Sequence, residues 1–111
     1  MKQLFTNYNF EFDKNEKKIL TTFSKQVLKQ LSGDEKFFSE TRAFNSILEK
    51  LNSGTESIKL TKDERTRLLN QLNENVKFLK KESTGSWFFK KWIYKSLLTQ
   101  YQAILENHFR G

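Results

Sequence analysis

The residue types that most often carry catalysis or bind metals are scarce in this chain. Cysteine is absent and histidine occurs once, as His108. Zinc, iron and copper sites on helices draw on several His or Cys side chains, or on Glu-x-x-His pairs that project into a bundle. His108 alone is better explained as a partly buried ring, or as a favourable charge near a helix C-terminus. The sequence therefore predicts no metal site and no cofactor.

The carboxylates are not arranged as a catalytic pair. Glu16 and Glu64 follow the common helix-capping residues Asp13 and Thr61 at the spacing of a capping box. The serines and threonines have no histidine base near them in the sequence, and there is no glycine-rich phosphate loop or G-x-S-x-G turn. The other glutamates that fall among lysines and asparagines are expected on solvated helix faces: Glu40, Glu49, Glu74, Glu82 and Glu106. No catalytic residue is predicted, and we do not expect an enzyme.

The most unusual segment, residues 77–95, combines a group of lysines with both tryptophans of the chain. Large aromatic side chains with lysines at their edge are typical of protein-binding hot spots. One helical face of about 100° cannot bury all the large apolar groups in residues 87–94, so at least one tryptophan should be exposed. The predicted partner-binding residues are Lys77, Lys80, Lys81, Trp87, Phe88, Lys90, Lys91, Trp92, Tyr94 and Lys95.

Other interpretations of residues 77–95 remain open. The rings could belong to the core and close one end of the fold beneath Leu4, Phe5, Tyr8 and Phe10. They could also stack on single-stranded nucleic acid, with the lysines neutralising phosphates, or lie at a membrane surface. A small, basic, cysteine-free helical chain is similar in general outline to bacteriocin immunity proteins and to small accessory proteins of mobile elements, with no specific motif behind the similarity. That resemblance implies a membrane-proximal, immunity-type function as a further alternative.

The overall charge is compatible with these partners but does not choose among them. The chain of 111 residues carries a net charge of +7, from 20 Lys and Arg against 13 Asp and Glu. Most of the positive charges are lysines, whereas bidentate recognition of phosphate favours arginine. Many lysines, asparagines and phenylalanines are also what an AT-rich genome encodes, so the basic charge can equally result from composition alone.

The elements that position these residues follow from two similar stretches. Residues 10–16 and 58–64 share an order of apolar, charged, apolar, cap, lysine, polar and glutamate, and each precedes a long amphipathic stretch. Apolar residues then recur at spacings of three and four, which predicts helices that begin at Asp13, Asp34, Thr61 and near Ser86. The predicted apolar stripes include Leu20, Phe23 and Val27; Phe37, Phe38, Phe44 and Ile47; Leu68, Leu72 and Val76; and Phe89, Ile93, Tyr101 and Ile104.

The residues just before the two capping boxes alternate apolar and charged side chains, which is a strand pattern. Lys17 and Arg65 offer no apolar partner for a hydrophobic staple, so Phe12 and Leu60 must pack elsewhere. These segments could pair as a two-stranded ribbon or lie over the helices as extended lead-ins. Because short isolated ribbons are marginally stable, the extended lead-ins are favoured.

Together these patterns predict an all-α protein, a single-domain four-helix bundle over residues 1–111 made of two antiparallel helical hairpins, with short extended segments at 8–12 and 57–60 as an addition. Internal breaks are expected at Gly33, Gly54 and Gly85. No secretory signal or membrane-spanning run is evident, and a cytoplasmic location is expected. The expected function is non-enzymatic binding of a macromolecule: a protein is favoured, and nucleic acid and a membrane surface are the alternatives. The oligomeric state is not predicted.

Overall fold

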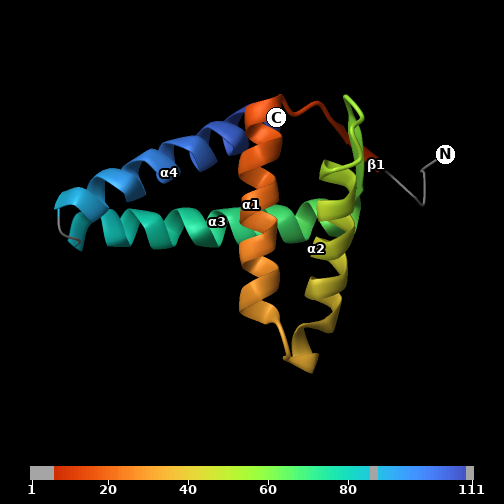
Figure 1. Cartoon of the computed structure of the whole chain (residues 1–111), viewed down its shortest axis with the longest axis horizontal. Coiled ribbons are helices and arrows are strands. Elements are labelled where there is room, and N and C mark those ends of the chain that lie inside the picture. The colour runs from red at the N-terminus through yellow and green to blue at the C-terminus, as the bar shows by residue number, and fades with distance from the viewer. Residues whose placement is uncertain (1–6, 86–87, 110–111) are drawn as a thin grey trace. The chain divides into compact units, whose positions relative to one another are not determined.

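The computed structural model describes residues 7–85 and 88–109, and for residues 7, 83–85 and 88–92 it describes the backbone without the side chains. The elements follow in the order β1 (Asn7–Phe10), α1 (Lys14–Leu31), the 3-10 turn η1 (Glu35–Phe37), α2 (Phe38–Leu51), β2 (Ile58–Thr61), α3 (Lys62–Gly85) and α4 (Phe88–His108) (Figure 1). The described residues thus form an all-α fold with four helices, as predicted, together with one small sheet.

The chain divides into two compact units, residues 1–68 and 69–111. The N-terminal unit holds the ribbon, α1, η1, α2 and the first turns of α3. The C-terminal unit holds the rest of α3 and all of α4. The single domain over residues 1–111 stays a prediction.

The first helix begins at the predicted capping box. The side chain of Asp13 accepts a hydrogen bond from the backbone N–H of Glu16 at 2.7 Å, and the backbone N–H of Asp13 donates to Glu16 Oε1 at 3.0 Å. These bonds satisfy amides that a helix start leaves without partners. After α1 ends, Gly33 has a φ of 83°, a left-handed conformation that favours glycine. Helices α1 and α2 then pack against each other as the predicted first hairpin.

The two segments before the capping boxes pair as an antiparallel ribbon, in which Asn7 lies opposite Thr61 and Phe10 opposite Ile58. The favoured interpretation, unpaired extended lead-ins, is therefore wrong. The ribbon is not isolated, because β2 contacts α2, and Phe10, Ile58 and Leu60 are 5%, 4% and 0% exposed. Burial of this apolar face stabilises a pairing that would be marginal in water. The ring of Phe12 stacks on Phe10 with centroids 5.2 Å apart.

The start of α2 differs from the prediction. The side chain of Asp34 accepts from the backbone N–H of Lys36 at 3.1 Å, and this cap opens the 3-10 turn η1, so that α2 begins only at Phe38. The predicted stripe placed Phe37 and Phe38 in the core, but they are 38% and 67% exposed. At about 100° per residue, Phe38 lies well to one side of the buried Phe44, and Phe37 belongs to the tighter turn. Both phenylalanines are consequently open to solvent.

In the C-terminal unit α3 and α4 run in opposite senses (Figure 1). Leu72 and Val76 of α3 are buried as predicted, and Leu79 is buried as well. On α4, Tyr101 and Ile104 are buried, whereas Ile93 is 46% exposed. The prediction that Ile93 belongs to the buried stripe is wrong, because among the described side chains of α4 the fully buried ones lie in its second half. Ile93 has the spacing of the apolar stripe, but no other described part of the fold buries it.

The capping box of α1 leads to a stability prediction. Asp13→Ala should lower the free energy of unfolding by about 1 kcal/mol, the usual cost of losing an N-cap side chain. Denaturant melts followed by circular dichroism measure the change. The matched control is Asn15→Ala, which alters an exposed residue of the same turn and should leave the midpoint nearly unchanged. Equal midpoints for the two variants would show that the Asp13–Glu16 box does not stabilise α1.

Candidate functional site

The first turn of α3 carries a partly buried carboxylate that ties together three parts of the N-terminal unit. Glu64 is 7% exposed. Its Oε1 accepts from Lys50 Nζ at 2.6 Å and from the backbone N–H of Thr61 at 2.9 Å, and its Oε2 accepts from the hydroxyl of Ser46. Ser46 and Lys50 lie one turn apart on α2, so both reach the same carboxylate. The hydroxyl of Thr61 accepts from the backbone N–H of Glu64 at 3.1 Å, which completes the predicted second capping box.

The environment of Glu64 keeps it ionised. Burial by itself raises the pKa of this carboxyl group, since it disfavours the charged form. Hydrogen bonds from Lys50, Ser46 and the backbone of Thr61, with the nearby charge of Lys50, outweigh burial and hold the pKa of Glu64 below its ordinary value. A carboxylate in this setting accepts hydrogen bonds and positions α2 against the start of α3. It is not a general acid held in its protonated form.

A second polar group lies one turn further along α3. Arg67 Nε donates to both carboxylate oxygens of Asp63 at 3.0 Å, and its NH1 donates to Glu40 Oε1 at 2.6 Å. The Glu40 side chain, expected on a solvated face, is only 16% exposed and pairs across to α3. Hydrogen bonds from Arg67 to Glu40 and then to Asp63 raise the pKa of the guanidinium further above its ordinary value, so it stays charged. This pair also joins α2 to the start of α3.

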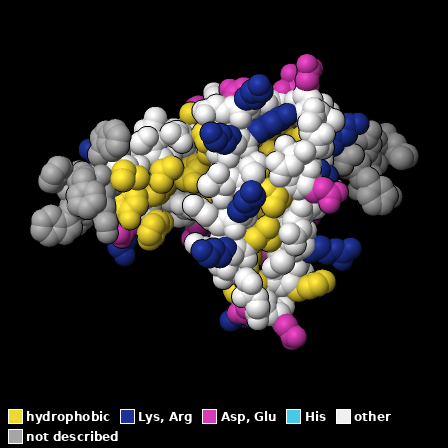
Figure 2. All heavy atoms as spheres, viewed as in Figure 1, with side chains coloured by type: hydrophobic (Ala, Val, Ile, Leu, Met, Phe, Trp, Pro, Cys, Tyr) yellow, Lys and Arg dark blue, Asp and Glu magenta, His cyan; other side chains and the backbone are white. Residues whose placement is uncertain are grey.

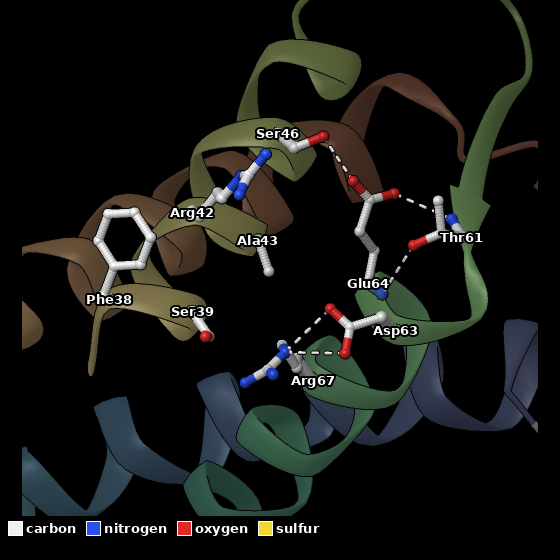
Figure 3. A pocket seen from close by; sticks show the side chains of 9 residues that line it. All are labelled: Phe38, Ser39, Arg42, Ala43, Ser46, Thr61, Asp63, Glu64 and Arg67. Atoms are coloured by element: carbon white, nitrogen blue, oxygen red, sulfur yellow. Dashed lines mark hydrogen bonds and ion pairs between the residues drawn. The ribbon is translucent and has the colours of Figure 1, made fainter. Parts of the chain in front are cut away.

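These contacts border a cavity of about 360 Å³ within the N-terminal unit. Figure 3 shows Phe38, Ser39 and Arg42 on the α2 side of the cavity and Asp63 and Arg67 on the α3 side. No hydrogen bond or ion pair joins the exposed Arg42 to another described residue, and no dashed line reaches it in Figure 3. The lining of the cavity thus includes charged side chains that are already paired, the guanidinium of Arg42, which is unpaired among the described residues, and the exposed ring of Phe38.

The predicted partner-binding residues fall in the C-terminal unit, and the structure describes only part of them. Lys77, Lys80, Lys81 and Lys95 are exposed, and Tyr94 is half-buried. Trp87 lies outside the described residues. The side chains of Phe88, Lys90, Lys91 and Trp92 also lie outside the described part of the chain. The predicted exposure of at least one tryptophan therefore stays a prediction.

Two large apolar side chains of this unit are open to solvent although the sequence analysis did not select them. Phe78 is 55% exposed and Ile93 is 46% exposed. Figure 2 shows hydrophobic side chains gathered on the face that α3 and α4 form in the C-terminal unit. Phe78 lies one residue before the buried Leu79, about 100° away around the helix, and this offset from the stripe could have identified it. Ile93 gave no such signal, because its spacing is that of a core residue.

The Glu64 and Arg67 contacts were also missed as a site. The capping role of Glu64 was predicted from its spacing to Thr61, but its bonds to Ser46 and Lys50 join residues 18 and 14 positions apart. Glu40 and Arg67 are 27 positions apart. Periodicity assigns residues to faces of one helix and says nothing about which faces meet. The sequence indicates only the pair of Asp63 and Arg67, which are four residues apart and therefore neighbours on one helix face.

Comparisons of this chain with protein families, with curated proteins and with solved structures found no match. Over the described residues, no helix combines the length and the apolar character needed to cross a membrane. The described residues also contain no group of three or more His, Cys, Asp or Glu side chains placed to hold a metal ion.

The depressed pKa of Glu64 makes a prediction about pH. A carboxyl group whose pKa is lower in the folded than in the unfolded chain contributes stability above the unfolded value, about 4.3 for Glu, and loses it as pH falls through the folded value. Glu64→Gln should lower the unfolding free energy at pH 7 by about 2 kcal/mol and should flatten its decline below about pH 4.5. Denaturant melts between pH 3 and pH 7 measure both effects.

The control for this titration is Glu49→Gln, which removes an exposed carboxylate of α2. This variant should keep the parent's pH dependence almost unchanged. If Glu64→Gln and Glu49→Gln follow the same curve as the parent, the bonds to Glu64 do not stabilise the folded chain.

Proposed function

We propose that this chain is a non-enzymatic binding protein that engages an acidic surface of a protein partner through its C-terminal unit. The observation that carries the proposal is the exposure of Phe78 and Ile93, at 55% and 46%, each within two residues of an exposed lysine in the sequence, Lys77 and Lys95. The basic apolar surface is defined here by these four residues and by the predicted partner-binding residues around them. Phe78 and Ile93 lie within about two helical turns of the connection between α3 and α4.

The physical argument rests on the combination of apolar area and charge. Large apolar side chains grouped on the surface of a protein commonly mark an interaction site. Aromatic and aliphatic groups at the centre of such a site supply affinity when a partner removes them from water, and charges at the edge steer the partner and fix its orientation. Lysines at the edge here favour a partner that presents carboxylates. The proposed compartment is the cytoplasm, as expected from the sequence.

Truncation of the exposed apolar side chains tests this proposal. The double variant Phe78→Ala and Ile93→Ala, used as bait in a pull-down from the source cell, should lose proteins that the parent retains, by about tenfold or more. Quantitative mass spectrometry measures the retained proteins. The matched control is Phe37→Ala, which removes an exposed ring of the N-terminal unit and should retain the same proteins as the parent. Equal retention by the double variant and the parent would contradict the proposal.

A charge-matched pair of variants tests the role of the lysines. Lys77→Glu with Lys95→Glu, and Lys18→Glu with Lys25→Glu on exposed positions of α1, each lower the net charge from +7 to +3. Only the first pair should weaken retention, because only it alters the basic apolar surface. Nuclease treatment of the lysate tests the alternative that the surface binds nucleic acid. Loss of the retained proteins after nuclease treatment would support that alternative, and binding would then weaken strongly with added salt.

A further inference from the structure

The cavity beside α2 and the start of α3 has features of a ligand site that is separate from the basic apolar surface. Its volume, about 360 Å³, falls within the range of small-ligand pockets. Its walls combine an exposed ring, Phe38, with the exposed guanidinium of Arg42 (Figure 3). We propose that this cavity binds a carboxylate group attached to an apolar residue of a peptide, with Arg42 as the group that recognises the carboxylate.

The charges that line the cavity restrict the charge that a ligand can carry there. Arg42 and Arg67 contribute two positive charges to the lining, and Asp63 and Glu64 contribute two negative ones. Arg67 donates hydrogen bonds to Asp63 and to Glu40, and Glu40 does not line the cavity. Among the described residues, Arg42 has no such partner. The exposed guanidinium of Arg42 can donate paired hydrogen bonds to one carboxylate, the geometry that arginine favours.

The same balance disfavours other classes of ligand. A phosphate dianion would add two negative charges to a lining that is neutral in sum and that includes the exposed Asp63 carboxylate. A cation would have to compete with Arg67 for Asp63 and with Lys50 for Glu64, and both pairs are already formed at 3.0 Å and 2.6 Å. A carboxylate instead completes the hydrogen bonding of Arg42 and disrupts neither pair.

The apolar part of the ligand is inferred from the lining next to Arg42. Phe38 is 67% exposed and lies one turn before Arg42 on α2. A ring or aliphatic side chain next to the ligand carboxylate would cover Phe38 while the carboxylate meets the guanidinium. The hydroxyl of Ser39, at the same edge in Figure 3, can donate one further hydrogen bond. The site is therefore suited to a peptide carboxylate beside a hydrophobic residue.

Nuclear magnetic resonance titration of the isotope-labelled full chain tests this inference. The probes are N-acetyl-phenylalanine, its neutral C-terminal amide, and acetyl-glutamyl-phenylalanine amide, which carries the carboxylate on a side chain. Amide signals of Ser39, Arg42 and Arg67 should shift with at least one acidic probe and should respond about tenfold more weakly to the neutral amide. The tighter of the two acidic probes identifies whether the carboxylate is a chain terminus or a side chain.

Substitution of the guanidinium provides the decisive comparison. Arg42→Gln should weaken binding of the acidic probe by about tenfold. Arg42→Lys should weaken it less, because lysine keeps the positive charge but lacks the two parallel N–H donors of the guanidinium. Arg65→Gln is the matched control, because Arg65 lies over the ring of Tyr8, 4.9 Å from its centroid, and does not line the cavity. The amide spectrum away from the cavity reports that each variant is folded.

Three outcomes would overturn the inference. The first is equal binding of the acid and its amide, and the second is equal binding by the parent and Arg42→Gln. The third is tighter binding of inorganic phosphate than of either carboxylate probe at the same residues. None of these measurements involves the basic apolar surface, so the inference stands or fails independently of the proposed function.

Discussion

The N-terminal unit depends on one partly buried carboxylate. Glu64 needs hydrogen-bond donors, because burial disfavours its charged form and the donors offset that cost. Its donors come from two positions on α2 and from the end of β2. These hydrogen bonds form together only when α2, the end of β2 and the start of α3 are correctly placed around Glu64. The second contact between α2 and α3, from Glu40 to Arg67, and the cavity between them follow from that agreement.

Local features of the fold could be predicted and distant contacts could not. Capping boxes at Asp13 and Thr61 and the left-handed Gly33 are decided by neighbouring residues, and the helices begin and end accordingly. Which faces meet is decided by packing between distant residues. The sequence therefore does not predict that the ribbon pairs, and it predicts burial for Phe38 and Ile93, which are exposed. Of the candidate sites, the lysines near the connection of α3 and α4 were predicted, whereas the cavity beside Arg42 was not.

The register of the ribbon bears on the similarity between residues 10–16 and 58–64. Phe10 lies directly opposite Ile58, and these are the residues that correspond in the two stretches. Antiparallel pairing of corresponding residues gives the ribbon a local twofold relation, with a capping box and a helix after each strand. The two compact units nevertheless carry different surfaces. Paired charges line a cavity in the N-terminal unit, and exposed apolar side chains stand among lysines in the C-terminal unit.

The role of Glu64 is tested most directly by a double-mutant cycle on its ion pair with Lys50, whose atoms lie 2.6 Å apart. Unfolding free energies of the parent, Lys50→Met, Glu64→Gln and the double variant give the coupling between the two side chains. We expect a coupling of about 1 kcal/mol or more, well above that of the exposed Glu74–Lys77 pair measured in the same way. A coupling no larger than that of the exposed pair would contradict the claim that this carboxylate holds α2 to the start of α3.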